Sequence, residues 1–323
     1  MILVTGAAGV SGSIIVRDFA RRKAKVRALV RDREKARELA ALPMIEVVEG
    51  DMLRPETLGA ALKDVERVLM ISSPDPQMVE TQCTFIDASR QAGVRHIVKF
   101  SGAESGVGFN PEAFRFTRMH EQIERHLEGS GLAWTHLRPS QFMQVYLRET
   151  PTIVAENALF LPMGNAKLAP VDIEDIAKVA FAVLLDGGHE AKSYDMTGPE
   201  ALTMTEVAER VSRAIGKTVR YVNVAPEEKR RALLAAGIPP ELADAIDELF
   251  AERRKRLESR VYLGTHELFE IQPTTFAEFA RRNAVVFRGQ PDAVREKDKR
   301  SRSLTPLSPE INHEKNCAIQ SQN

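Results

Sequence analysis

The sequence predicts a doubly wound α/β fold, in which helices cover both faces of a parallel sheet, followed by a smaller and mostly helical lobe. Two features of the first 150 residues carry this prediction. Short apolar runs of strand length alternate with segments of helical periodicity, which is typical of a parallel sheet. The first apolar run also passes directly into a glycine-rich turn at residues 6–12. With 323 residues and 43% hydrophobic content, the chain is long enough for this domain and a second lobe.

Strands and helices are expected to alternate through the first half of the chain. Strands are expected over 2–5, 26–30, 45–48, 67–72, 96–100 and 133–137. Helices are expected from the glycine turn to about residue 22 and over 33–41, 56–62, 77–92 and 116–129. Ligands of such sheets bind at the carboxyl ends of the strands, so the residues that follow each strand are the candidates for a site.

The pattern changes at about residue 150, where proline and glycine interrupt shorter segments. Helices are expected over 173–185, 204–215, 226–236, 239–258 and 274–283, and the strands at 193–196 and 219–222 either rejoin the sheet or form a small ribbon. Residues 290–323 are polar with few apolar side chains, so they are expected to form a disordered tail. The predicted organisation is therefore a sheet domain at 1–150, a second lobe at 151–289 and the tail at 290–323.

The composition disfavours several kinds of partner. Lysine plus arginine and aspartate plus glutamate each number 45, so the net charge gives no reason to expect nucleic acid or an anionic membrane. No apolar run approaches the roughly 18 residues that span a bilayer, and no signal segment is recognised, which favours a cytoplasmic protein. We expect a monomer or homodimer whose partner is a small molecule. Cys83 and Cys317 make no disulfide framework, and Cys83 is expected to be a small buried thiol.

The turn at residues 6–12 has the spacing of a dinucleotide-binding motif. In that motif Gly6 allows the tight turn, Gly9 lets backbone N–H groups approach a pyrophosphate, and Gly12 lets the helix pack on its strand. The positive end of the helix dipole then faces the phosphates. The alternative is an ordinary glycine-rich turn. The cofactor-binding residues expected here are Thr5, Gly6, Ala7, Ala8, Gly9, Val10, Ser11 and Gly12.

The residue after the second strand indicates which nicotinamide cofactor is bound. Enzymes that use NAD place a carboxylate there, about 20 residues past the motif, to accept a hydrogen bond from the ribose 2′-hydroxyl. This chain has Arg31, whose guanidinium suits a 2′-phosphate, so NADP(H) is favoured over NAD(H). Arg33 and Lys35 lie close enough to add charge, while Asp32 and Glu34 dilute it. The alternative is a solvated charged loop.

Short-chain reductases that bind NADP on this kind of sheet normally use a tyrosine as general acid, with a lysine four residues later that lowers its pKa. This sequence lacks that pair. At that spacing, the four tyrosines are followed by Thr150, Gly198, Ala225 and His266. Tyrosine acid catalysis on an alcohol or ketone is therefore disfavoured. The polar residues at the strand ends are instead Ser72, Ser73, Ser101 and the segment 138–141, with His120 on a following helix.

Ser101 and His120 are the catalytic candidates, and Ser101 is expected near the nicotinamide. His120 and Glu124 share a helix face at i,i+4 spacing. A histidine beside a carboxylate can titrate near neutrality and donate a proton as the acceptor takes hydride. The alternative is a surface His–Glu pair. His126 and His136 are too far apart in the pattern for a metal site, so no metal is expected.

Several longer segments add to these motifs. They are VTGAAGVSG at 4–12, ALVRD with Arg31, EGDM at 49–52, HIVKFSGAES at 96–105, SGLAWTHLRPSQFMQ at 130–144, PVDIEDIA at 170–177, YDMTGPEALT at 194–203 and PTTFAEFARRNA at 273–284. With them the chain resembles, from residue 1 to about residue 288, the NmrA-like family of atypical short-chain dehydrogenases/reductases. That family includes bacterial NADPH quinone reductases and triphenylmethane-dye reductases.

The resemblance implies roles at matching positions, with the backbone of 6–12 holding the pyrophosphate. The other implied cofactor contacts are Arg31 at the 2′-phosphate, Asp51 and Met52 at the adenine edge, and Ser72, Ser73 and Pro74 on the ribose side. Plant reductases of the wider group carry a catalytic lysine where this chain has His120, and other bacterial members are similar in having histidine there. The departure leaves open a His-assisted reduction or cofactor binding without turnover.

Aromatic residues indicate a flat substrate. Phe109, Phe114 and Phe116 are expected to form a lid over the nicotinamide, faced by the substrate contacts Phe142 and Tyr146. The alternative is that they form core between the lobes. The expected function is an NADPH-dependent reductase that transfers hydride to a quinone-like or conjugated aromatic small molecule. The alternative function is a non-catalytic NADP(H)-binding redox sensor, and an isomerase or biosynthetic reductase is a third possibility.

Overall fold

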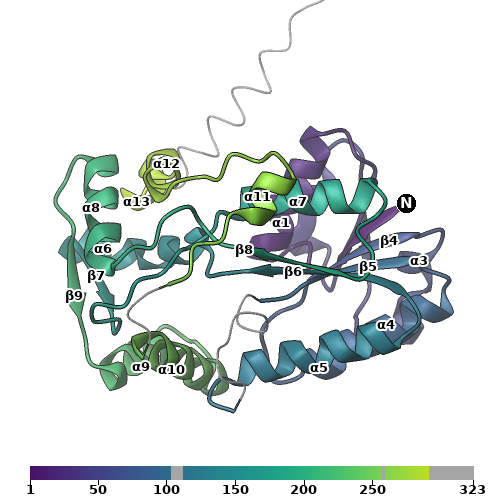
Figure 1. Ribbon diagram of the computed structural model, residues 1–323, viewed down its shortest axis with the longest axis horizontal. Coiled ribbons are helices and arrows are strands. Elements are labelled where there is room, and N and C mark those ends of the chain that lie inside the picture. Colours follow the sequence, from purple (N-terminus) through teal and green to yellow (C-terminus); the bar gives the residue numbers. More distant parts are fainter. Residues whose placement is uncertain (103–111, 256–258, 291–323) are drawn as a thin grey trace, which may run out of the picture.

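A computed structural model describes residues 1–102, 112–255 and 259–290. Its centre is a sheet of seven parallel strands in the order β3-β2-β1-β4-β5-β6-β8 (Figure 1). The strands are β1 (Ile2–Val4), β2 (Val26–Val30), β3 (Ile45–Glu49), β4 (Arg67–Met70), β5 (His96–Phe100), β6 (Ala133–Pro139) and β8 (Lys192–Met196). The order reverses between β1 and β4, as in a Rossmann fold. The predicted fold class is confirmed.

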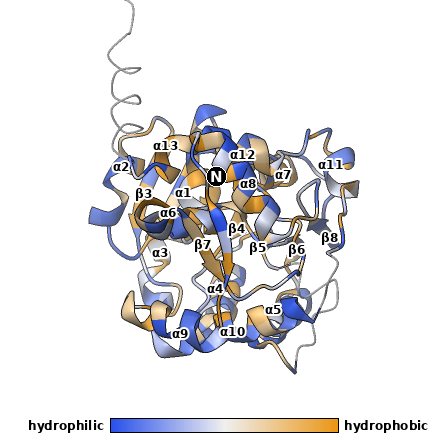
Figure 2. Cartoon of the chain, turned by 90° about the vertical axis from the view of Figure 1, so that its left-hand side faces the viewer, coloured by the Kyte–Doolittle hydropathy of each residue, from blue (hydrophilic) through white to orange (hydrophobic). Residues whose placement is uncertain are grey.

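Helices cover both faces of this sheet, as Figure 1 shows. One face carries α1 (Val10–Arg21), α2 (Arg37–Ala40) and α7 (Ile173–Leu185), and the other carries α3 (Gly59–Leu62), α4 (Met78–Gln91) and α5 (Arg115–Gly129). The central strands β1, β2, β4 and β5 are almost entirely buried between them, and Figure 2 shows hydrophobic residues gathered on the sheet. Two expected helices are shorter than predicted, because single 3₁₀ turns at Glu34–Ala36 and Pro55–Thr57 replace their first residues.

The second lobe has a core of its own, made by helices packed around a two-stranded parallel ribbon. Its elements are a 3₁₀ helix (Met143–Glu149), α6 (Thr150–Glu156), β7 (Ala158–Leu161), α8 (Met204–Ile215), β9 (Arg220–Asn223), α9 (Pro226–Ala235), α10 (Pro240–Arg254), α12 (Phe276–Arg282) and α13 (Ala284–Phe287). The short helix α11 (Gly264–Leu268) lies against β8 instead. The sequence left open where the strands at 193–196 and 219–222 would pair. The first joins the main sheet as β8, and the second pairs with β7 in the ribbon as β9. The sequence did not predict β7 or α6.

The chain passes several times between the two cores, and the connecting segments are hydrogen-bonded to one another. The N–H of Met143 donates to the carbonyl of Val171 at 2.9 Å, and Leu168 and Leu202 bond each other in both directions. Between these crossings, α7 and β8 pack in the core of the first domain. The domain limit at residue 150 stays a prediction, and the predicted tail lies outside the described residues apart from Gln290. No helix of the described ranges is long and apolar enough to cross a membrane.

The turn after β1 packs tightly against β4 and the start of α1. Gly6 has a φ of +57°, and a Cβ there would lie 2.8 Å from the carbonyl oxygen of Ile71. A Cβ on Gly12 would lie 2.2 Å from the carbonyl oxygen of Gly6 and 2.9 Å from the Cα of Ala7. Both contacts are with backbone atoms, which cannot move aside as the end of a flexible side chain can. These glycines therefore bring β1, β4 and α1 together where the strand order reverses.

We expect Gly12→Ala to lower the free energy of unfolding by about 3 kcal/mol, because its methyl group collides with fixed backbone. Urea denaturation followed by circular dichroism measures this loss. Gly59→Ala is the matched control, since a Cβ at Gly59 meets nothing within 4 Å. The control is expected to change the free energy of unfolding by less than about 1 kcal/mol. Equal effects of the two substitutions would contradict the packing role of Gly12.

Candidate active site

The amino end of α1 is open to an anion. Gly9 precedes this helix without a side-chain cap, and the first helical turn contains no acidic residue. Ala8, Gly9 and Val10 are exposed at this end. Exposed backbone N–H groups and the positive end of a helix dipole are the features that bind phosphate. Together with the contacts that exclude a side chain at Gly6 and Gly12, this cradle fits the pyrophosphate of a dinucleotide.

Thr5 and Ala7, also predicted to bind the cofactor, lie beneath this cradle. Thr5 is buried, and its hydroxyl donates to the carbonyl of Ile71 at 2.6 Å while accepting from the Ile71 N–H at 2.8 Å. The N–H of Ala7 donates to the carbonyl of Leu29 at 3.4 Å. The structure therefore gives both residues a role in joining the ends of β1, β2 and β4.

Arg31 is exposed directly after β2, the strand next to β1. Its cationic neighbours have partners: Arg33 donates to the carbonyl of Val47 at 2.7 Å, and Lys35 lies 3.9 Å from Asp32. Within the described ranges, the Arg31 guanidinium makes no hydrogen bond or ion pair. It is therefore available to an external anion, as recognition of a 2′-phosphate requires.

The other predicted cofactor contacts follow β3 and β4 at the same edge of the sheet. The carboxylate of Asp51 accepts from the N–H of Leu53 at 3.0 Å, and Met52 is buried. The hydroxyl of Ser72 accepts from the side-chain amide of Gln82 at 2.8 Å, and Ser73 is exposed. Their roles at the adenine and ribose stay predictions.

A lysine that the sequence analysis did not single out lies at the centre of the candidate site. Lys99, the penultimate residue of β5, is fully buried. Its Nζ donates to the Oγ of Ser101 at 3.2 Å and lies 2.9 Å from Nδ1 of His120. The two residues predicted to be catalytic are thus brought together by a third. The signal was present in the sequence, because a charged residue interrupts the otherwise apolar run of a strand buried on both faces.

Glu124, one turn after His120 on α5, completes this cluster. Ser101 donates to one carboxylate oxygen of Glu124 at 2.5 Å, and Arg138 of β6 binds both oxygens, at 3.2 and 2.6 Å. Burial alone would raise the pKa of Glu124, but the hydrogen bond from Arg138 and the other nearby donors and cations bring that pKa below its usual value. Glu124 is therefore an ionised partner of Arg138.

These contacts correct the expectation for His120. Its ring bonds Lys99 instead of pairing with Glu124, and burial together with the charge of Lys99 lowers the pKa of His120 well below its usual value. The ring is therefore neutral at pH 7. Burial is also the main cause that lowers the pKa of Lys99, to about 7, while Glu124 opposes that shift and Arg138 adds to it. Lys99, and not His120, is the group that titrates near neutrality.

The predicted aromatic contacts divide between the site and the core. Phe142 is half-buried, and its ring centre lies 5.6 Å from that of Phe100 at the carboxyl end of β5. Tyr146 is only 2% exposed and packs against Phe276 and Met204 in the second core, which corrects its prediction as a substrate contact. Its spacing to Phe142 did not reveal that the 3₁₀ helix turns it away. Phe109 lies outside the described residues.

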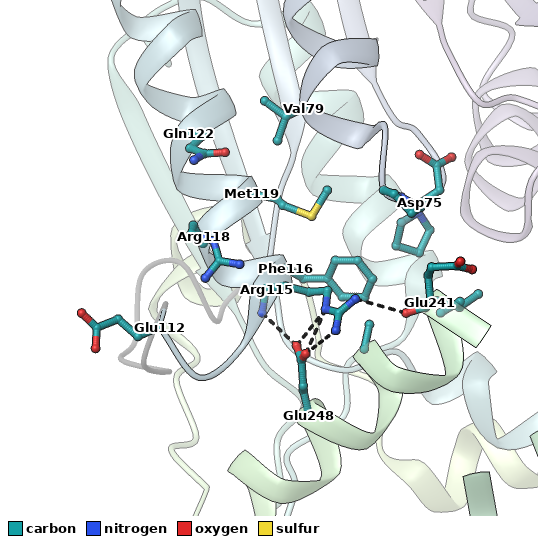
Figure 3. Close-up of a pocket in the computed structure, with 14 residues that line it drawn as sticks. Asp75, Val79, Glu112, Arg115, Phe116, Arg118, Met119, Gln122, Glu241 and Glu248 are labelled. Atoms are coloured by element: carbon teal, nitrogen blue, oxygen red, sulfur yellow. Dashed lines mark hydrogen bonds and ion pairs between the residues drawn. The ribbon is translucent and has the colours of Figure 1, made fainter. Parts of the chain in front are cut away.

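A cavity of about 450 Å³ lies between α4, α5 and α10. Val79, Phe116 and Met119 form its apolar part, and Pro74 of the loop after β4 borders it. Figure 3 shows Arg115 of α5 facing Glu248 of α10, with hydrogen bonds of 3.0 Å from its Nε to both carboxylate oxygens. Seven of the fourteen residues that line the cavity are charged or polar, so an aromatic ligand would contact only its apolar part. The sequence predicted Phe116 in a lid over the nicotinamide, and it predicted neither this cavity nor the contribution of α10.

Comparison with known proteins finds several that are named as reductases or oxidoreductases. The chain is 36% identical over 288 residues to the NAD(P)H azoreductase of Xenophilus azovorans, covering 89% of this chain and 99% of the relative. A solved structure of an Escherichia coli NADPH-dependent quinone oxidoreductase in complex with NADPH matches with a TM-score of 0.76 and 29% identity, over 87% of this chain and 99% of that one. The Citrobacter sp. triphenylmethane reductase in complex with NADP(H) matches with a TM-score of 0.76 and 26% identity, over 88% and 100%.

The family assignment rests on most of the chain. Residues 1–280 match the model of one family, a range that includes the glycine turn, the buried cluster around Lys99 and the greater part of the second lobe. The resemblance noted in the sequence is confirmed: this chain belongs to the NmrA-like family.

Proposed function

We propose that this protein is an NAD(P)H-dependent oxidoreductase that prefers NADPH and reduces a quinone-like or other conjugated aromatic acceptor. One observation carries the proposal: a single edge of the sheet holds an open phosphate cradle, the neutral ring of His120 and an Arg31 that makes no ion pair with a described residue. Relatives named as azo, quinone and triphenylmethane reductases support it. A cytoplasmic location and a monomeric or homodimeric state stay predictions of the sequence.

The residues of the chain divide the work between binding and proton transfer. The turn at 6–12 and Arg31 hold the phosphate groups, and Ser101 lies beside the expected position of the nicotinamide. NADPH supplies a hydride when it is bound. His120, held by Lys99 through Nδ1, offers Nε2 to the acceptor, and within the described residues this nitrogen makes no hydrogen bond. A neutral ring that carries its proton on Nε2 donates it to the oxygen or nitrogen that is reduced.

The nature of the site supports a planar and electron-poor acceptor. Such molecules accept hydride readily, so a weak acid such as a neutral histidine is a sufficient proton donor. The apolar part of the cavity at Val79, Phe116 and Met119 offers aromatic and sulfur contacts to a flat ring. His120 follows Met119 directly on α5, so we place the acceptor at this end of the helix.

Purified protein is expected to oxidise NADPH in the presence of quinones and azo dyes, followed as the loss of absorbance at about 340 nm. A panel that also contains simple ketones and aldehydes is the control, and we expect no turnover with these because the Tyr/Lys pair is absent. Tight and equal binding of NADPH and NADP⁺ without turnover of any acceptor would count against a reductase.

Arg31→Glu is expected to raise the Kd of NADPH about 100-fold relative to that of NADH, because a repelling carboxylate replaces the cation at the 2′-phosphate. Isothermal titration with both cofactors gives the ratio. Lys25→Glu is the matched control: Lys25 is exposed at the other end of the same strand, so it makes an equal charge reversal far from the cradle. An unchanged ratio in Arg31→Glu would exclude Arg31 as the 2′-phosphate contact.

His120→Ala is expected to lower kcat for a quinone about 100-fold while the Kd of NADPH stays within about twofold, because the ring gives a proton and binds no phosphate. Steady-state kinetics and a cofactor titration separate the two effects. His126→Ala is the control on the same helix, where the ring bonds Asp87 at 3.0 Å instead. A fully active His120→Ala would make His120 a structural residue.

A further inference from the structure

During the reduction itself, while the acceptor lies against Nε2, the proton that His120 gives away has to be replaced from inside the protein. The side of its ring that carries Nδ1 faces Lys99, whose side chain has no exposed surface. A neutral imidazole that loses its Nε2 proton becomes an imidazolate unless a proton reaches Nδ1. The ammonium group of Lys99 lies 2.9 Å from that nitrogen and is the group of this cluster that bonds it.

We propose that Lys99 is a positioning residue that fixes the His120 proton on Nε2 and replaces it through Nδ1 as the acceptor is reduced. This inference rests on the proposed reductase function. Reduction of a quinone or an azo bond by one hydride needs one proton to give a neutral product. The Nε2–H bond breaks as that proton moves to the acceptor, and one N–H bond of the Lys99 ammonium breaks as a proton moves to Nδ1. The step ends with a neutral His120 and a neutral Lys99 amine, so charge and protons balance.

The surroundings of Lys99 allow both of its protonation states. The titratable and charged groups that surround it are Cys83 on α4, His120 and Glu124 on α5, and His136 and Arg138 on β6. Glu124 favours the ammonium, while burial and Arg138 oppose it, which leaves the pKa of Lys99 at about 7. A donor with this pKa is protonated in a large fraction of molecules at neutral pH and releases its proton readily.

Recharging takes the reverse route. Lys99 has no contact with solvent, whereas His120 is partly exposed. A proton from solvent enters at Nε2, and the Nδ1 proton returns to the Lys99 amine, which restores the starting state. Ser101 keeps the Nζ in place throughout, since its Oγ accepts from Lys99 and donates to Glu124.

The first test is the pH profile of kcat with a quinone between about pH 6 and 9. Because the protonated lysine is the active form, wild-type kcat is expected to be full below the Lys99 pKa and to fall about tenfold per unit above it. Lys99→Met, which keeps the side-chain length without the charge, is expected to lower kcat about tenfold at pH 7, with the NADPH Kd unchanged, and to abolish this inflection. Lys178→Met is the control, because Lys178 pairs with Asp175 on α7, on the other face of the sheet. A wild-type profile that is flat, or an inflection that survives in Lys99→Met, would overturn the proposal.

The second test needs no turnover and therefore separates this inference from the reductase assignment. In the full chain labelled with ¹⁵N-histidine, the His120 resonances are assigned by their loss in His120→Ala. Wild type is expected to carry the ring proton on Nε2 with Nδ1 accepting, and Lys99→Met is expected to lose that preference and to raise the His120 pKa. A wild-type ring protonated on Nδ1 overturns the proposal even when quinones are reduced. If no acceptor is reduced, the function fails on its own and this spectrum alone decides whether Lys99 holds His120.

Discussion

The candidate site depends on one constraint: a parallel sheet brings the carboxyl ends of all its strands to the same edge. β1, β2, β4, β5 and β6 each end there, so residues far apart in the sequence meet at this edge. The turn after β1 is in close contact with the residue that follows β4. Thr5 and Gly6 make it with Ile71, one through hydrogen bonds and the other through the lack of a side chain.

The charged side chains of Glu124 and Lys99 are buried at this edge, so other interactions must replace their lost hydration. An ionised group removed from water is costly unless partners and hydrogen bonds replace the lost solvent. Glu124 obtains them from Arg138 and Ser101. Among the described residues, Lys99 has only Ser101 and His120 as hydrogen-bond partners, and burial lowers its pKa. Glu124 therefore keeps its negative charge at neutral pH, whereas Lys99 readily loses its positive charge. Perturbed groups of this kind are frequent at functional sites.

The sequence was sufficient for features that local spacing encodes. The glycine turn, the seven strands of the main sheet and Arg31 could be located because each depends on neighbouring residues. The partner of His120 could not, since Glu124 is its neighbour on the helix, while Lys99 reaches it only through packing of α5 on β5. β7 was missed for the same reason: it is four residues long and pairs only with β9, about sixty residues later. Tyr146 was misplaced because its direction is set by the 3₁₀ helix that carries it.

The repeated crossings between the two cores have a mechanical consequence. A lobe joined by one flexible segment can swing and twist in any direction. Here the segments that cross are tied together by the bond of Met143 to Val171 and by the paired bonds of Leu168 and Leu202. The second lobe is therefore held at several linked points and is less free to swing or twist than a lobe on a single linker. A movement of α10 away from α5 would break the contact of Arg115 with Glu248 and would leave the bonds of the connecting segments intact.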